Sequence, residues 1–95
     1  MVKIVWTDLA IRDLKSIHHY IALDSKFYAK RFVTKLISRV DHLEVFPNSG
    51  RTVPEFNNIS IRELIQGNYR LVYKVEAKSV TILRFHNSAR TLKDI

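Results

Sequence analysis

Hydrophobic residues recur at helical spacing in the first half of the chain. The segment that follows Thr7 has apolar positions 4, 3 and 4 residues apart. Thr7 or Asp8 can cap the start of a helix there, because a side-chain oxygen accepts a hydrogen bond from an unpaired backbone N–H. The pattern therefore predicts an amphipathic helix that ends before Leu23 and buries one stripe. The members of that stripe are Ala10, Leu14, Ile17 and Ile21.

A second helical stripe runs from about Lys26 to Phe46. Asp24 and Ser25 separate the two stripes, and both residue types favour a turn or a helix cap. Pro47 is expected to end the second helix, because proline has no backbone N–H and clashes with the preceding turn. Two helices joined this closely are expected to pack as an antiparallel hairpin. The second stripe comprises Ala29, Phe32, Leu36, Val40 and Leu43, widened by Val33 and Ile37.

The second half of the chain alternates between apolar and polar residues, as strands do. Turn signals fall at residues 66–68 and 76–78, and both prolines lie in a predicted loop at 47–58. We expect one domain over residues 1–95, with an α+β fold in the order β-α-α-β-β-β. The last three strands form an antiparallel meander that the first strand joins, and the helical hairpin covers one face. The predicted strands are Val2–Trp6, Ile59–Leu64, Tyr69–Val75, and Ser79 or Val80 to His86.

Alternation within the strands separates an apolar face from a face that carries arginines. Tyr69, Leu71, Tyr73 and Val75 share the face expected to meet the helices. If the turns centre near Gly67 and Ala77, several basic and apolar residues lie together on the opposite face, which suits an acidic, partly apolar partner. The alternative is that Glu55, Glu63 or Glu76 pairs with the arginines and nothing binds. The predicted binding residues are Arg62, Arg70, Val72, Val80, Ile82 and Arg84.

The charge balance favours acidic partners. The chain has 16 Lys and Arg against 9 Asp and Glu, a formal net charge of +7. Nucleic acid, an acidic protein and an anionic membrane surface all suit that excess. The chain has no cysteine, which excludes disulfides and thiolate chemistry and fits a cytoplasmic location. No segment reaches the roughly 20 apolar residues of a membrane span, so we expect no membrane association.

Candidate catalytic chemistry is sparse. His86 closes the last predicted strand and is either a general acid or base or a structural residue. His18, His19 and His42 lack the spacing and the nearby carboxylates of a metal site, so no metal is expected. The sequence also lacks a phosphate-binding glycine loop and a dinucleotide fingerprint, so no cofactor is expected.

A set of short motifs, in order along almost the whole chain, resembles the RelE/ParE superfamily of bacterial type II toxins, and most closely its ParE-like members. The resemblance implies a β-α-α-β-β-β fold, a hetero-oligomer with a cognate antitoxin that neutralises the toxin, and growth inhibition. The matching residues are Trp6, Ala10, Asp13-Leu14, Ile17, Tyr20-Ile21, Phe46-Pro47, Gly50-Arg51, Val53-Pro54-Glu55, Ile61-Arg62-Glu63-Leu64, Tyr69-Arg70, Tyr73, His86 and Arg90.

The resemblance implies two alternative targets. ParE-like members poison DNA gyrase, and RelE-like members cut mRNA on the ribosome with basic side chains in place of a metal. A RelE-like reading makes Arg70, His86 and Arg90 the catalytic set, although Ile61 and Glu63 stand where RelE has lysines. The GRxVPE-type loop and the His-x-x-x-Arg ending favour gyrase. A third reading is a non-toxic module that only binds an antitoxin.

Overall fold

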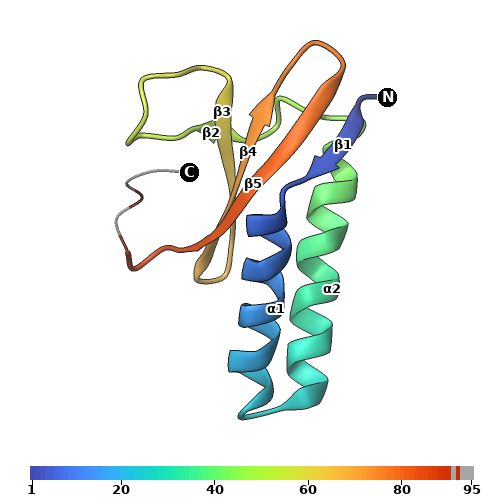
Figure 1. Ribbon diagram of the computed structural model, residues 1–95, viewed down its shortest axis with the longest axis vertical. Helices are drawn as coiled ribbons and strands as arrows, with labels where there is room; N and C mark the ends of the chain where they lie inside the picture. Colours follow the sequence, from blue (N-terminus) through green and yellow to red (C-terminus); the bar gives the residue numbers. More distant parts are fainter. Residues whose placement is uncertain (91, 93–95) are drawn as a thin grey trace.

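A computed structural model describes residues 1–90 and 92. The strands form one mixed sheet in the order β1-β5-β4-β3-β2, with β1 parallel to β5 and the other pairs antiparallel. The helices follow β1 and pack beside the sheet (Figure 1). The predicted α+β fold and its order are therefore confirmed. The elements are β1 (Lys3–Trp6), α1 (Asp8–Ala22), α2 (Lys26–His42), β2 (Arg51–Thr52), β3 (Ile61–Gln66), β4 (Tyr69–Val75) and β5 (Ser79–Asn87).

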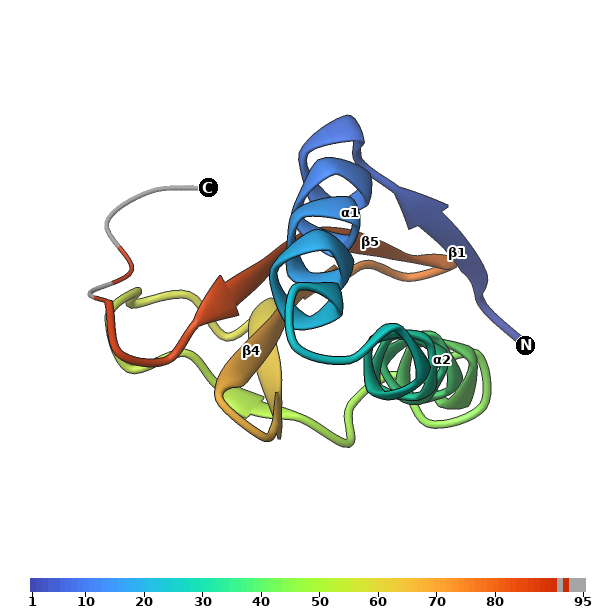
Figure 2. The same ribbon diagram turned by 90° about the horizontal axis from the view of Figure 1, so that it is seen from below.

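Side-chain caps begin both helices. The Thr7 hydroxyl accepts a hydrogen bond from the N–H of Ala10 at 3.1 Å and donates one to the carbonyl of Ile82 at 2.8 Å, so it joins α1 to the sheet. The Ser25 hydroxyl accepts from the N–H of Tyr28 at 3.1 Å at the start of α2. Figure 2 looks along the two helices and shows them side by side as the predicted hairpin.

The second helix ends at His42, four residues before the Phe46 expected from the sequence. Leu43 and Glu44 donate to carbonyls three residues back, Val40 and Asp41, so the last turn tightens and stops. The freed carbonyl of Glu44 then accepts from the N–H of Val2 at 3.1 Å. Termination is therefore local and precedes Pro47.

The main core lies between the helices and the sheet. Both predicted helical stripes face it, apart from Ile37, which is 38% exposed and lies outside the core. The face of β4 expected to meet the helices does so, with Leu71 and Tyr73 almost wholly buried. The buried members of this core are Ala10, Leu14, Ile17, Leu36, Val40, Leu43, Leu71, Tyr73, Val80, Ile82 and Phe85.

The opposite face of the sheet is covered as well. The chain between β2 and β3 folds over it, and Val53 and Phe56 pack with Val72 and Leu83. Leu92, beyond the end of β5, joins the same cluster at 2 % exposure. The central strand β4 is thus buried from both sides, and the predicted open face does not exist.

The predicted register was wrong, and the predicted sharing of one face by three arginines holds for Arg70 and Arg84 but not for Arg62. Gly67 adopts φ 57°, and Gln66 pairs with Tyr69 across a two-residue turn. The turn therefore centres between Gly67 and Asn68, not on Gly67. This shift changes which residues lie opposite each other by one position, and a one-residue change of register moves a side chain to the other face. Arg62 consequently lies opposite Tyr73, on the helix side of the sheet.

The turn between β4 and β5, together with an irregularity in the pairing of these strands, changes the face on which two of the predicted site residues of β5 lie. Val75 pairs with Val80, and the register shifts between Val72 and Tyr73. Val80 and Ile82 therefore face the helices, contrary to the prediction. The residues that pair across these two strands are Arg70 with His86 and Val72 with Arg84.

The loop at 47–58 also contains the short strand β2, which the sequence did not predict. Just before it, Gly50 is buried and its N–H donates to the Tyr73 hydroxyl at 2.8 Å. A Cβ at Gly50 would lie 2.5 Å from the carbonyl oxygen of Glu63 and 2.5 Å from the Tyr73 hydroxyl. Only glycine fits here without movement of the sheet.

Replacement of this glycine is expected to destabilise the fold. Gly50→Ala should lower the free energy of unfolding by about 2–3 kcal/mol, because the added methyl overlaps backbone. Urea unfolding of the wild type and the variant measures the difference. Asn48→Ala, at an exposed position in the same loop, is the control. Equal stability of Gly50→Ala and the wild type would contradict the tight approach.

Candidate functional site

A four-residue ionic network lies where the loop meets the sheet. Glu63 of β3 has a wholly buried side chain, and its two oxygens accept from different arginines. Arg51 of β2 donates Nε–H to Glu63 Oε2 at 2.7 Å, and Arg70 of β4 donates Nε–H to Glu63 Oε1. Arg70 then donates Nη1–H and Nη2–H to the two oxygens of Glu55 at 2.6 and 2.7 Å. The arrangement joins three strands and the loop.

The network is electrically balanced. Two carboxylates face two guanidinium groups, which is the condition under which buried charge is tolerated. The hydrogen bonds from Arg70 hold the pKa of Glu55 at about 2, below its ordinary 4.5, although burial opposes the shift. The same contact with Glu55 raises the pKa of Arg70. Both groups therefore stay charged across the physiological range.

Arg70 is consequently a largely internal cation. Its side chain is only 9 % exposed, and three of its N–H groups are directed at carboxylates. The sequence-based alternative, in which Glu55 and Glu63 neutralise an arginine, describes this site. A phosphate group can reach Arg70 only by displacing Glu55.

The other two arginines of the predicted site lie elsewhere. Arg62 donates Nη1–H to the carbonyl of Gly50 at 2.9 Å, on the helix side of the sheet. Arg84 donates to both carboxylate oxygens of Asp13 in α1, at 3.0 and 3.1 Å. Each arginine thus joins its strand to a different neighbour: Arg70 to the two glutamates, Arg62 to Gly50, and Arg84 to α1.

The apolar members of the predicted site offer no surface in this conformation. Val72, Val80 and Ile82 are each 0 % exposed. Val72 lies under the loop, and the other two lie under the helices. Any role in partner binding would require the loop or the helices to move.

His86 and Arg90 line a cleft of about 490 Å³ between α1 and the end of β5. The imidazole Nε2 of His86 lies 3.0 Å from the carbonyl oxygen of Arg90. Burial is the main cause that raises the pKa of Tyr69 in the same cleft, and nearby Arg90 opposes it. Arg70 lies opposite His86 in the register of β4 and β5 but does not line the cleft. The predicted catalytic set of Arg70, His86 and Arg90 is therefore divided.

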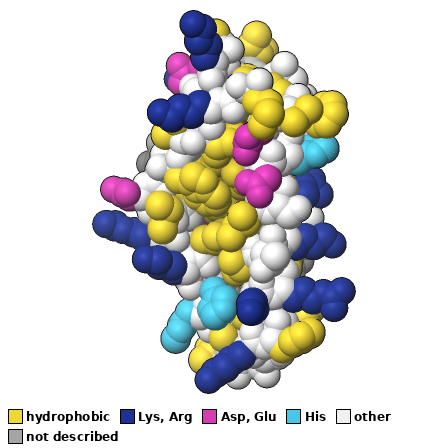
Figure 3. Space-filling model, turned by 90° about the vertical axis from the view of Figure 1, so that its right-hand side faces the viewer, with side chains coloured by type: hydrophobic (Ala, Val, Ile, Leu, Met, Phe, Trp, Pro, Cys, Tyr) yellow, Lys and Arg dark blue, Asp and Glu magenta, His cyan; other side chains and the backbone are white. Residues whose placement is uncertain are grey.

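An apolar groove on the outer side of the hairpin was missed by the sequence reading. It has a volume of about 290 Å³ and lies between α1, α2 and the end of β1. Val5, Leu9 and Ile37 are 38–39 % exposed and extend the apolar surface near it. Figure 3 shows a broad hydrophobic area on this side, with Lys and Arg along both flanks and some Asp or Glu side chains at its edge. The residues that line the groove are Trp6, Ile11, Leu14, Lys15, His18 and Val33.

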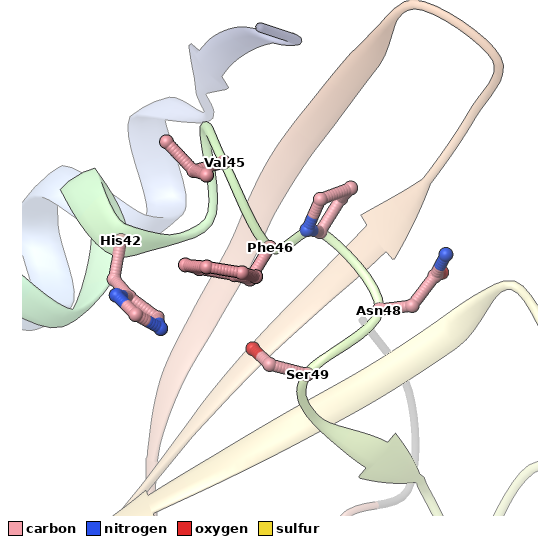
Figure 4. A pocket seen from close by; sticks show the side chains of 6 residues that line it. His42, Val45, Phe46, Asn48 and Ser49 are labelled. Carbon is pink, nitrogen blue, oxygen red and sulfur yellow. The ribbon is translucent and has the colours of Figure 1, made fainter.

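A second surface hollow lies where α2 ends. Figure 4 shows the Phe46 ring beside His42, and their ring centroids are 4.8 Å apart. Val45 and Phe46 are 57 % and 54 % exposed, so this turn presents apolar side chains to solvent. The sequence feature that could have revealed this hollow is the apolar pair Val45-Phe46, which follows the last buried residue of the second stripe, Leu43.

Two further properties concern only the part of the chain that the structure describes. No group of three or more His, Asp or Glu side chains there could hold a metal ion. Neither α1 nor α2 is long and apolar enough to cross a membrane.

Comparisons with known proteins agree with the fold described above. The family model described as "ParE toxin of type II toxin-antitoxin system, parDE" matches residues 4–92. The chain is 33% identical over 91 residues to Toxin RelE2 of Caulobacter vibrioides, covering 95% of this chain and 99% of that protein. A solved structure described as the chromosomal ParDE TA system from P. aeruginosa superposes with a TM-score of 0.74 at 27% identity, covering 92% of this chain and 96% of that chain.

The matched fold and the near-complete coverage define a toxin of the RelE/ParE superfamily. The chain belongs to the ParE toxin family of type II toxin–antitoxin systems. The family implies an antitoxin partner.

The two arginines that share Glu63 should differ in their effect on stability. Arg70→Ala should cost about 3–5 kcal/mol of unfolding free energy, because it leaves buried Glu63 and nearby Glu55 without a main partner. Arg51→Ala should cost less than about 1 kcal/mol, because that side chain is 64% exposed. Denaturant unfolding measures both. Similar costs would contradict the assignment of Arg70 as the central cation.

The Glu55 contact should depend on pH. Because the folded-state pKa is lowered to about 2 from 4.5, the contribution is complete above 4.5 and is lost as pH falls toward 2. Solvent screens a side chain that is 27% exposed, so the contribution is on the order of 1–2 kcal/mol. Unfolding of wild type and Glu55→Gln as a function of pH tests this. A stability difference that persists unchanged near pH 2 would rule it out.

Proposed function

We propose that the chain is a growth-inhibiting toxin that acts on DNA gyrase in the cytoplasm and that a cognate antitoxin neutralises. The observation that carries this choice is the engagement of Arg70 by Glu55 and Glu63. A metal-independent nuclease needs free cations around the scissile phosphate. Here the best-placed strand cation is already neutralised, and a buried carboxylate lies beside it.

Glu63 adds to this argument. Its side chain is wholly buried and negatively charged in the network. By resemblance, this position would hold a lysine in a RelE-like nuclease. A carboxylate there repels phosphate where a lysine would attract it. Inhibition of gyrase by surface contact requires no such phosphate site.

Ribosome-dependent mRNA cleavage is the second candidate. The cleft that holds His86 and Arg90 supports it, because an imidazole and a guanidinium can move a proton and stabilise charge. The 33% identity to a protein named Toxin RelE2 also supports it. The third candidate, a non-toxic antitoxin-binding module, predicts that expression without antitoxin leaves growth unchanged.

The groove on the outer side of the helical hairpin is the surface we assign to the antitoxin. It is apolar and lies at the surface of the free chain. Helix α2 contributes Lys26, Lys30, Arg31, Lys35 and Arg39 but only one acidic residue, Asp41. An amphipathic antitoxin segment with acidic flanks matches both features.

A paired assay on the antitoxin-free protein distinguishes the targets. One reaction adds it to gyrase and plasmid DNA and measures supercoiling and trapped cleaved DNA. The other adds it to translating ribosomes and maps mRNA ends. We expect gyrase inhibition with intact mRNA. Cleaved mRNA with unaffected gyrase would reverse the proposal and make His86 and Arg90 the residues to mutate.

The antitoxin surface can be tested with matched substitutions. Ile11→Glu places a charge in the hairpin groove and should weaken binding of the cognate antitoxin by at least about 10-fold. Ile59→Glu makes the same change at a residue that is 80% exposed outside the groove, and it should bind normally. Titration calorimetry with both folded variants gives the comparison. Equal affinities would exclude the groove.

A further inference from the structure

The Nη1 and Nη2 atoms form the outer edge of Arg70. This edge has the geometry of a ligand-binding site that Glu55 of the same chain occupies. Glu55 meets Nη1 and Nη2 with one oxygen each, the bidentate arrangement by which guanidinium groups bind carboxylates. The Arg70 side chain is only 9% exposed, so its position is fixed before any ligand binds. Glu55 is the more exposed of the two partners, since its side chain is 27% exposed.

The Glu55 carboxylate is held by Arg70 and by backbone hydrogen bonds from Glu55 itself and from Leu92, and few other contacts fasten the segment that carries it. Backbone hydrogen bonds join the loop to β3 at Val53, whose N–H donates to the carbonyl of Ile61 at 3.2 Å. Beyond Val53, the Phe56 N–H donates back to Val53 within the loop at 3.2 Å. Phe56 packs only partly into the cluster beneath. Residues 54–57 can therefore lift without breaking the pairing of β2 with β3.

Lifting the segment leaves an uncompensated cation. Arg51 and Arg70 would then share only the single charge of Glu63, which gives the site a net charge of +1. An uncompensated cation in a buried position is costly, so the site gains by taking another anion. One carboxylate restores neutrality. A phosphate carries more charge and would sit beside Glu63, which disfavours it.

We infer that the outer edge of Arg70 is a carboxylate-binding site that Glu55 fills in the free chain, and that an Asp or Glu side chain of an acidic protein partner replaces Glu55 when residues 54–57 lift. The net charge of +7 brings such partners to the chain. The site is separate from the hairpin groove, and it does not depend on whether gyrase or mRNA is the target.

Acetate can replace the missing side chain in a direct test. In Glu55→Gln, acetate titrated at constant ionic strength and neutral pH should produce saturable shifts of the Arg70 Nε–H resonance and of the Phe56 amide. Its apparent affinity should be at least about 10-fold higher than for the wild type, where tethered Glu55 competes. Inorganic phosphate should bind less tightly than acetate.

Two controls separate the site from general charge effects. Glu76→Gln removes an exposed carboxylate in the β4–β5 turn and should respond to acetate as the wild type does. Adding Arg70→Lys to Glu55→Gln should abolish saturation, because an ammonium group cannot provide the bidentate pair. If Glu55→Gln is unfolded, acetate should restore its folded spectrum.

The contrary outcomes are equally definite. An acetate response that is identical in the wild type, Glu55→Gln and Glu76→Gln would overturn the site. Tighter binding of phosphate than acetate would overturn the carboxylate assignment. Failure of acetate to restore an unfolded Glu55→Gln variant would also count against the inference.

Discussion

The buried carboxylate of Glu63 is the constraint on which the rest of this structure depends. A wholly buried charge must be paired, and Glu63 is paired twice, with Arg51 on one side and Arg70 on the other. Satisfying it fixes β2 against β3 and fills the inner side of Arg70. The outer side of Arg70 then needs an anion of its own, and Glu55 of the loop supplies it.

Loop closure changes what the sheet can offer to a partner. With Val53 and Phe56 folded over Val72, β4 is buried from both sides. The surfaces left for binding lie at the periphery, in the hairpin groove, in the cleft beside His86 and in the hollow at the end of α2. The same residues that make the chain resemble the toxin superfamily around the loop, from Gly50 to Glu55, are thus the ones that close it.

Periodicity was sufficient for the order of the main elements and for the helical and β4 parts of the main core, but not for Val80 and Ile82 of β5. The helical stripes and the apolar face of β4 are properties of local sequence, and burial follows them directly. Register is different, because one residue of error in a turn reverses every side chain of a strand. The compact turn at Gly67 was enough to move Arg62 to the helix side, away from Arg70, and the turn between β4 and β5 moved Val80 and Ile82 to that side as well.

The site was harder to predict because its chemistry is non-local. The pairing of β3 with β4 brings Glu63 to Arg70, and the closed loop adds Glu55, which is 15 residues away from Arg70 in sequence. The sequence supported two readings of the arginines, exposed or neutralised by glutamates. The choice between them depended on burial, which the alternation of residues along single strands does not determine.

A double-mutant cycle between Glu63 and Arg70 tests this account most directly. The unfolding free energies of the wild type, Glu63→Gln, Arg70→Gln and the double variant give their coupling energy. The account predicts a coupling of at least about 2 kcal/mol, since each single change strands a buried partner. A coupling below about 0.5 kcal/mol would mean that the pair does not hold the structure.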